Sequence, residues 1–396
     1  MATVLFASNV AAENGLDSTT GYAENYVETG LEMVSDFDAD DVDINWDTTT
    51  VSTSTELEDA LENAEPGDKI VIASGTYTGN FELTTSGTQS LPIWVVAEDS
   101  TDMPILDGDD SDNNTVLSID GTDQDDGISY IYIEDILVTG GRTGISFDMV
   151  NYSTVDNVEV YGVGQAGIHL RDGSSYNIVK NSNVHDTGLY NVKYGEAIYI
   201  GSDYTKWPDA DGTSSYDPAV DYNQILSNIL GPNVTAEHID VKEGSSYSYI
   251  IGNTFDAEGM DDIINGGLSF IDFKGNYAEA AYNEGDQNDN EYFENAFEIN
   301  EKSTGWGYYN EIHDNSITFD VDDDGEESSY SEDSVSVTLT LPLGSAGDVE
   351  TTEDIDPDHW VVKNNVDDSD ATNTVYDNTR DPVDADKMYT GDLTEN

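Results

Sequence analysis

The chain repeats a short strand motif about every 23 to 25 residues, and this repetition limits the possible folds more than any other feature. In each copy apolar side chains alternate with other residues, as in GISFD, GIHLR and FIDFK. The copies that align most plainly are 144–148, 167–171, 197–201, 238–242, 270–274 and 296–300. A repeat of this length that contains strands and no helix is typical of one coil of a parallel β-solenoid, because stacked coils bury the apolar residues that a single coil cannot. We therefore expect an all-β, right-handed parallel β-helix, the hand that parallel crossovers adopt.

A second family of segments begins with tyrosine and ends with asparagine, and its plainest copies are 222–228, 247–253 and 309–315. Asparagine tolerates the left-handed backbone conformation and bonds to neighbouring backbone groups. We therefore expect these asparagines to occupy bends and to form hydrogen bonds between coils.

The flanks of the repeat array indicate the domain organisation. A short helix is expected over 55–64, where Thr55 and Glu58 have the spacing of a capping box, and it would cover the open end of the solenoid. Two segments, 203–221 and 277–295, interrupt the repeat and are expected to be long loops. The expected divisions are an acidic N-terminal extension at 1–50, the β-helix at 51–370 and an acidic C-terminal tail at 371–396.

The net charge excludes some partners. The chain has 83 acidic and 12 basic residues, a net charge of −71, and no cysteine. This charge repels nucleic acid and anionic membrane surfaces, and no apolar run is long enough to span a bilayer. We therefore expect neither nucleic-acid binding nor membrane insertion. Because about 1 M salt shortens the Debye length to roughly 3 Å, the charge favours an extracellular or cell-surface location, with a high-salt environment as one form of it.

The strand alternation places scarce cations on one strip of the surface. Outward-facing positions of the aligned copies form one column, Ser146, His169, Tyr199, Asp240, Asp272 and Glu298. The adjacent column contains Arg171, Lys242 and Lys274, three of the twelve cations, and His238 lies beside it. This gathering predicts a site for an acidic ligand. The alternative is a ladder of surface salt bridges, Lys242 with Asp240 and Lys274 with Asp272, worth about 0–1 kcal/mol each.

Two further features are candidate binding elements. Trp207 in the first long segment and Trp306 after the last aligned copy could stack on sugar rings or pack loops onto the solenoid. The stretch 320–325 begins like a calcium-binding EF-hand loop, but the glutamate expected at position 12 comes one residue late, at 332, so an acidic turn is the favoured interpretation.

The stretches 195–202, 231–244 and 252–256 resemble secreted right-handed parallel β-helix proteins of the pectate-lyase superfold. The spacing of Glu237 and Lys242 is similar to that in the catalytic coil of the chondroitinase-B and alginate-lyase branch of polysaccharide lyases. The resemblance implies that Lys242 is the Brønsted base, that Glu237 helps to hold a Ca²⁺ ion, and that the substrate is an acidic polysaccharide. That branch has an acidic ligand where this chain has Thr235, and an arginine near the position of Asn265.

Three functions remain open at this point. The favoured one is a polysaccharide lyase that cleaves a uronate-containing polymer by β-elimination, since a cationic strip can stabilise the developing enolate and Lys242, beside Arg171 and Lys274, can supply the base. A glycosidase would use paired carboxylates such as Asp240 and Asp272. The third is a non-catalytic adhesin, surface or filament subunit, whose acidic flanks would mediate self-assembly. For the lyase the candidate catalytic residues are Lys242, Arg171, Lys274, His169 and His238, the candidate substrate-binding residues are Tyr199, Trp207, Asp240, Asp272 and Trp306, and the candidate metal ligand is Glu237.

Overall fold

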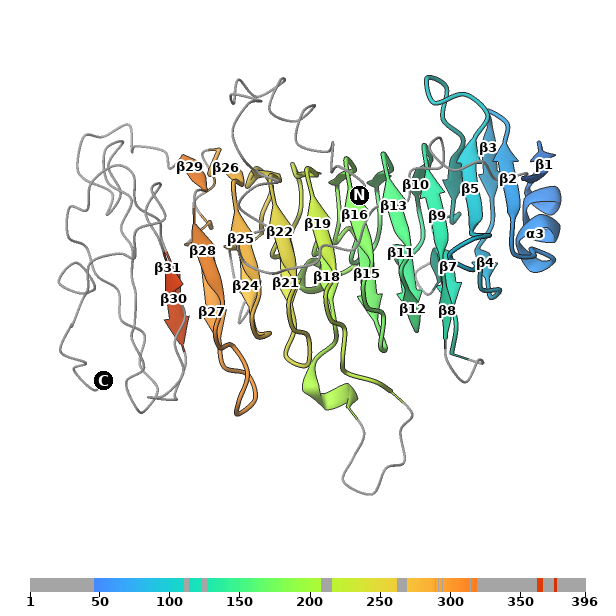
Figure 1. Ribbon diagram of the computed structural model, residues 1–396. Coiled ribbons are helices and arrows are strands. Elements are labelled where there is room, and N and C mark those ends of the chain that lie inside the picture. The colour runs from blue at the N-terminus through green and yellow to red at the C-terminus, as the bar shows by residue number, and fades with distance from the viewer. Residues whose placement is uncertain are drawn as a thin grey trace, which may run out of the picture. The chain divides into compact units, whose positions relative to one another are not determined.

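The computed structural model describes residues 46–109, 114–122, 127–207, 216–261, 269–288, 290, 292–293, 295–313, 315–318, 362–365 and 374–375. Each coil passes through three parallel sheets, A, B and C, and neighbouring coils pair strand to strand (Figure 1). Sheet A contains β1 (Asp47–Val51), β2 (Asp68–Ile72), β5 (Ile93–Ala97), β9 (Ile131–Glu134), β13 (Thr154–Asp156), β16 (Ile178–Lys180), β19 (Gln224–Leu226), β22 (Tyr249–Ile251), β25 (Glu279–Ala281), β28 (Glu311–His313) and β31 (Thr374–Val375). Sheet B contains β3 (Thr76–Thr78), β6 (Ile105–Asp107), β10 (Leu137–Thr139), β14 (Glu159–Tyr161), β17 (Asn183–His185), β20 (Ile229–Leu230), β23 (Thr254–Asp256), β26 (Glu284–Asp286) and β29 (Ser316–Thr318). Sheet C contains β4 (Phe81–Leu83), β7 (Thr115–Asp120), β11 (Thr143–Asp148), β15 (Ile168–Arg171), β18 (Ile198–Ile200), β21 (Ile239–Val241), β24 (Ser269–Phe273), β27 (Asn295–Asn300) and β30 (Val362–Asn365). A small extra pair joins β8 (Ile128–Ser129) and β12 (Val150–Asn151).

The expected parallel β-helix is confirmed, and the aligned copies are the strands of sheet C. Ile145 lies opposite Ile168, and Ile198 lies opposite Ile239. These isoleucines are fully buried, so the inward-facing positions of successive coils stack into one continuous core. Among the described residues the first strand begins at residue 47 and the last at 374.

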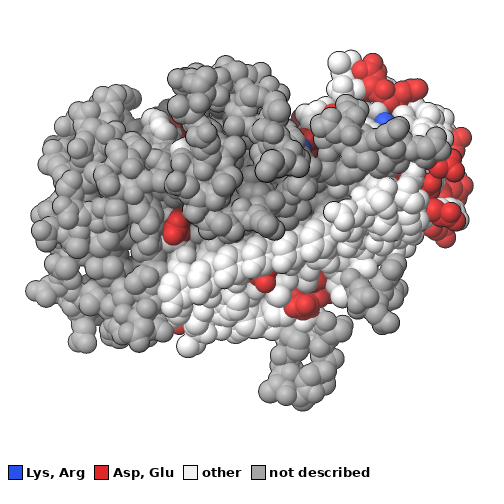
Figure 2. Space-filling model, in the orientation of Figure 1, with Lys and Arg blue, Asp and Glu red and all other residues white. Residues whose placement is uncertain are grey.

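The capping helix α3 (Ser54–Glu62) begins slightly earlier than expected. Its N-cap is Thr53, whose hydroxyl accepts the Glu56 N–H at 3.2 Å, while the Glu56 carboxylate accepts the Ser52 N–H at 2.8 Å. The expected box at Thr55 was therefore wrong by two residues, because Thr53 is an equally good cap with Glu56 three residues later. Leu57 and Leu61 are buried against the first coil. Figure 2 shows that acidic side chains gather at this capped end of the described chain.

The bends between coils are built by tyrosines and asparagines. Tyr222 and Tyr247 adopt positive φ, and their rings stack at 4.7 Å between centroids. Asn228 is buried, and its backbone N–H donates to Asn253 Oδ1 at 2.9 Å, so the expected bonds between coils are present. The expected left-handed conformation belongs instead to the residue before each asparagine, Ser227 before Asn228 and Gly252 before Asn253.

The segment 277–295 is not one long loop, which corrects the sequence interpretation. It contains β25 and β26, which pair with strands of the preceding coil. Their sequences, EAA and EGD, contain no large apolar residue. The Phe270 ring occupies the space where a Cβ at position 285 would lie, so a glycine fits there. Of the other long segment, 208–215 lies outside the described residues, as do Asn265 and the stretch 320–325. No helix in the described part of the chain is long and apolar enough to cross a membrane.

Candidate active site

The outward-facing column of sheet C has the register that the repeat predicted. His169 pairs with Tyr199, Tyr199 with Asp240, and Asp240 with Asp272 across adjacent strands. Adjacent parallel strands lie about 4.8 Å apart, so side chains in the column reach one another.

Lys274 is at the centre of a buried ionic network. Its ammonium lies 2.7 Å from Asp240 Oδ1, 2.7 Å from Asp272 Oδ2 and 3.7 Å from Glu237 Oε1. Lys274 is 3% exposed, and both aspartates are 1% exposed. Burial opposes the charge, but these carboxylates outweigh it and raise the pKa of Lys274 well above its usual value. The salt bridges considered from the sequence exist, but they form a buried network and not a surface ladder.

Lys242 and Tyr199 lie next to this network, closer to solvent. The Lys242 ammonium is 2.9 Å from Asp240 Oδ2 and 5.4 Å from the centroid of the Tyr199 ring. Burial, followed by the charges of Asp240 and Glu196, raises the pKa of Tyr199 well above its usual value. The Tyr199 phenol therefore keeps its proton at neutral pH and can donate it.

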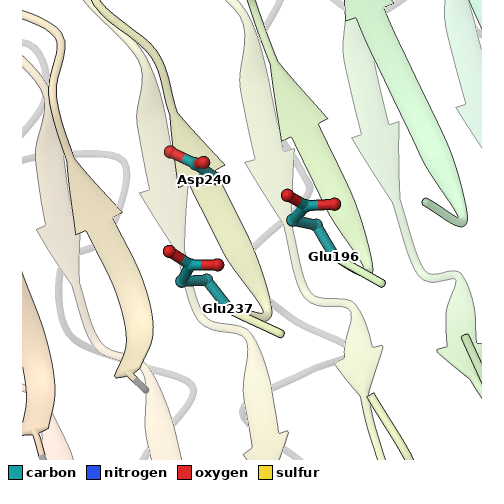
Figure 3. A group of neighbouring side chains, drawn as sticks. All are labelled: Glu196, Glu237 and Asp240. Atoms are coloured by element: carbon teal, nitrogen blue, oxygen red, sulfur yellow. The ribbon is translucent and has the colours of Figure 1, made fainter. Parts of the chain in front are cut away.

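Glu196 is a site residue that the sequence reasoning missed. Ligand atoms of Glu196, Glu237 and Asp240 lie within 4.8 Å of one another. Figure 3 shows Glu237 and Asp240 on one strand segment and Glu196 just before the neighbouring strand. Burial, and then the charges of Glu237 and Asp240, raises the pKa of Glu196 to about 8. The available signal was the alignment of Ala197 with His238, which places Glu196 opposite Glu237.

This acidic cluster has the oxygen ligands that calcium prefers, but too few of them are available. A calcium ion takes six to eight oxygens. Asp240 already directs one oxygen at Lys274 and the other at Lys242. Glu196 and Glu237 would therefore supply most of the carboxylate oxygens for an ion at this cluster. The Lys274 ammonium also lies beside Glu237, and its positive charge opposes a bound cation. Water or a bound ligand would have to supply the rest of a calcium shell at this cluster.

His169 and Arg171 occupy the neighbouring strand. His169 packs against Tyr199 at 4.4 Å between ring centroids, and its Nε2 lies 2.8 Å from the Gly201 carbonyl oxygen. A carbonyl oxygen only accepts, so Nε2 carries the proton. Burial, and then the Arg171 charge, lowers the pKa of His169 to about 3, so the ring is neutral. Arg171 Nε lies 3.0 Å from Asp148 Oδ1, and the arginine side chain is 36% exposed.

His238 does not face this column, contrary to the sequence interpretation. It is fully buried, with its ring edge-on to Phe255 and Phe270. Its Nε2 lies 2.7 Å from the Asp256 carbonyl oxygen. The strict alternation begins only at Ile239, where β21 starts, so it does not apply to the residue before it.

The two predicted tryptophans meet beyond the ends of the sheet C strands. Trp207 and Trp306 lie 6.0 Å apart between ring centroids, in an edge-to-face arrangement. Trp207 also packs on Gly244, two residues after Lys242. Both are half-buried, and their contact with a substrate stays a prediction.

A family model described as the Pel9A-like right-handed beta helix region matches residues 38–197. The crystal structure of an alginate lyase from Paenibacillus sp. str. FPU-7 is 36% identical, with 69% of this chain and 87% of that chain covered and a TM-score of 0.64. A rhamnogalacturonan lyase is 14% identical, with 69% and 83% covered and a TM-score of 0.50, a likeness in fold alone. Among curated proteins no match was found.

Proposed function

The chain belongs to the right-handed β-helix family of the Paenibacillus alginate lyase, and on this basis we propose that it is a polysaccharide lyase acting on a uronate-containing glycan. The observation that carries the proposal is the placement of Lys242 beside Tyr199 on the outer face of sheet C. Alginate, which the name of that relative gives as its substrate, is the first candidate polymer.

β-Elimination needs a base, an acid and a positive charge. The base removes the proton next to the uronate carboxylate, a carbon–carbon double bond forms as the glycosidic carbon–oxygen bond breaks, and the leaving oxygen takes a proton. Lys242 is the proposed base, and the Tyr199 phenol is the proposed acid.

The buried network supports Lys242 in this role. Asp240 contacts both Lys242 and Lys274. When Lys242 is neutral, Asp240 therefore remains paired with Lys274, and no buried carboxylate is left uncompensated. Arg171 and Lys274 each have carboxylate partners, so the proposed mechanism does not rely on their charges to make Lys242 a base.

Arg171 is the proposed partner of the substrate carboxylate. It precedes Lys242 by two strands in sheet C, about 10 Å at 4.8 Å per strand. Its side chain is partly exposed, and its Nε faces Asp148. The guanidinium carries further N–H donors besides the one at Nε. Positive charge placed there stabilises the enolate that develops in the transition state. No step of this mechanism depends on a calcium ion.

The buried network counts against a glycosidase built on Asp240 and Asp272. Both carboxylates are 1% exposed and both contact Lys274, so neither faces a water or a leaving group. Their proposed role is to position the lysines.

The test is to incubate the full chain with alginate, pectate and chondroitin and to follow both ultraviolet absorbance and reducing ends. A lyase produces one absorbing double bond for each new reducing end. Reducing ends without absorbance would indicate a hydrolase, and neither signal on any polymer would leave the non-catalytic surface protein as the better account.

We also propose an extracellular or cell-surface location, in a medium where salt screens the charge of −71. Screening weakens repulsion between exposed carboxylates. Thermal unfolding midpoints should therefore rise steeply between low salt and about 1 M salt, where the Debye length is roughly 3 Å. A midpoint that does not change with salt would contradict this proposal.

A further inference from the structure

Between β17 and β18 the chain projects large apolar side chains into solvent. Leu189, Tyr190 and Tyr194 are 67%, 61% and 54% exposed, and the projection contains the short 3-10 turn η1 (Val192–Tyr194). Single exposed apolar residues are common, but several next to one another usually mark a binding surface.

The projection is held firmly by both neighbouring coils. The N–H groups of Leu189 and Tyr190 donate to the carbonyl oxygens of Val163 and Gly164, at 3.1 and 3.0 Å. On the other side, Thr235 Oγ1 donates to the Val192 carbonyl oxygen at 3.1 Å. Side chains presented on such a fixed backbone lose little conformational freedom on binding, so the surface is preorganised for a ligand.

Two exposed cations accompany the tyrosines. Lys193 lies within the projection, and Arg142 lies two coils earlier, between β10 and β11. Gly164 lies between Arg142 and Tyr190 and shows that the two are close. A Cβ built on this glycine would lie 3.0 Å from the Tyr190 Cβ and 3.4 Å from the Arg142 Cα. In a chain with only twelve cations, one on this projection and a second beside it favour an anionic ligand. Tyrosine rings stack on flat apolar surfaces while their hydroxyls bond to polar groups, which suits a sugar ring.

The projection lies at the opposite end of the sheet C strands from Lys242. It ends at Gly195, just before Glu196 and β18, whereas Lys242 lies beside Gly201 after the ends of β18 and β21. Tyr194 precedes Gly201 by seven residues, which span at most about 23 Å at 3.3 Å per residue. Only a polymer could contact both places at once.

We propose that Arg142, Leu189, Tyr190, Lys193 and Tyr194, here called the tyrosine platform, form a second binding site for a polyuronate chain. The platform holds the polymer several sugars away from the position where Lys242 acts. This inference rests on the proposed lyase function for its ligand class, but it is tested by binding as well as by activity.

The first test is affinity electrophoresis of the full chain in gels that contain alginate or neutral dextran. Alginate should retard the parent protein, and the Tyr190→Ala/Tyr194→Ala variant should bind about tenfold more weakly, from the loss of two aromatic contacts. Arg142→Gln/Lys193→Gln should make binding less dependent on salt. The matched control is Ile229→Ala, which removes a side chain that is 54% exposed on sheet B and should change nothing.

The second test is kinetic. For long polymers the tyrosine variant should raise KM about tenfold with kcat unchanged, while short oligosaccharides should be cleaved as by the parent. Equal retardation of parent and tyrosine variant would overturn the platform, even if the lyase activity is real. Retardation that the tyrosine variant loses would support the platform, even if no polymer is cleaved. A dimer in light scattering that the tyrosine variant abolishes, with alginate binding unchanged, would assign the surface to a second copy of the chain and overturn the proposal.

Discussion

Replacing Lys274 with methionine tests the buried network directly, because methionine keeps most of the side-chain volume and removes the charge. Asp240 would keep Lys242 as a partner at 2.9 Å, whereas among the described residues Asp272 would keep the Asn300 amide, at 2.7 Å, and no cation. An uncompensated charge at a site that is 1% exposed is costly. Removing one partner of a buried pair destabilises a protein by about 3–5 kcal/mol.

Differential scanning calorimetry of Lys274→Met is the appropriate assay, with the shift in midpoint as the observable, since a solenoid need not unfold in one step. At about 2–4 °C per kcal/mol, the expected loss is on the order of 10 °C. The double variant Lys274→Met/Asp272→Asn should recover most of it, because it removes the orphaned charge.

Salt distinguishes this network from the surface ladder. The Lys274→Met loss should persist at about 1 M salt, where exposed pairs are screened. A loss below about 1 kcal/mol that vanishes in salt would match surface pairs and would refute the buried network. A double variant no more stable than the single one would refute the assignment of the cost to Asp272.

Three further predictions follow from the site and the core. Chelation of divalent ions should leave lyase activity unchanged, because two available glutamates fall short of a calcium shell; loss of activity that calcium alone restores would contradict this. Burial lowers the pKa of His238 to about 4, below its usual value of about 6.5. As the pH falls from about 6.5 toward 4, the free energy of unfolding should therefore fall by on the order of 3 kcal/mol, because the unfolded chain takes up the proton first. A His238→Gln variant should lack this part of the pH dependence in thermal unfolding. Gly285→Ala should destabilise the chain by about 1–3 kcal/mol through overlap with the Phe270 ring, and adding Phe270→Leu should relieve part of that loss in chemical unfolding.

The fold could be predicted because the repeat has a characteristic length and because apolar residues alternate in the same way in each copy. Coil length fixes which segments stack, and the two-residue period of a strand fixes which side chains face outward. The repeat therefore predicts the register in which Tyr199 pairs with Asp240 and Asp240 with Asp272. The alternation applies only within a strand. His238 lies one residue before β21 begins, and its side chain is buried.

The chemistry of the site was harder to read than its register. Glu196 is one of 83 acidic residues, and only its stacking on Glu237 distinguishes it. The depth of Lys274 depends on three carboxylates from two strand segments closing around one ammonium, and a pattern of spacing does not contain that information. β25 and β26 escaped notice for a related reason, since the core there is filled by Phe270 from another strand.

The most direct test of the account is the turnover of a Lys242→Arg variant on the polymer that the parent chain cleaves. Arginine keeps the positive charge and the contact with Asp240, but it stays protonated and cannot accept a proton. If Lys242 is the base, turnover should fall by about 10²–10⁴-fold, with the thermal midpoint and the KM nearly unchanged. A variant that retains most of its turnover would show that the charge alone matters and that the proton is removed by another group.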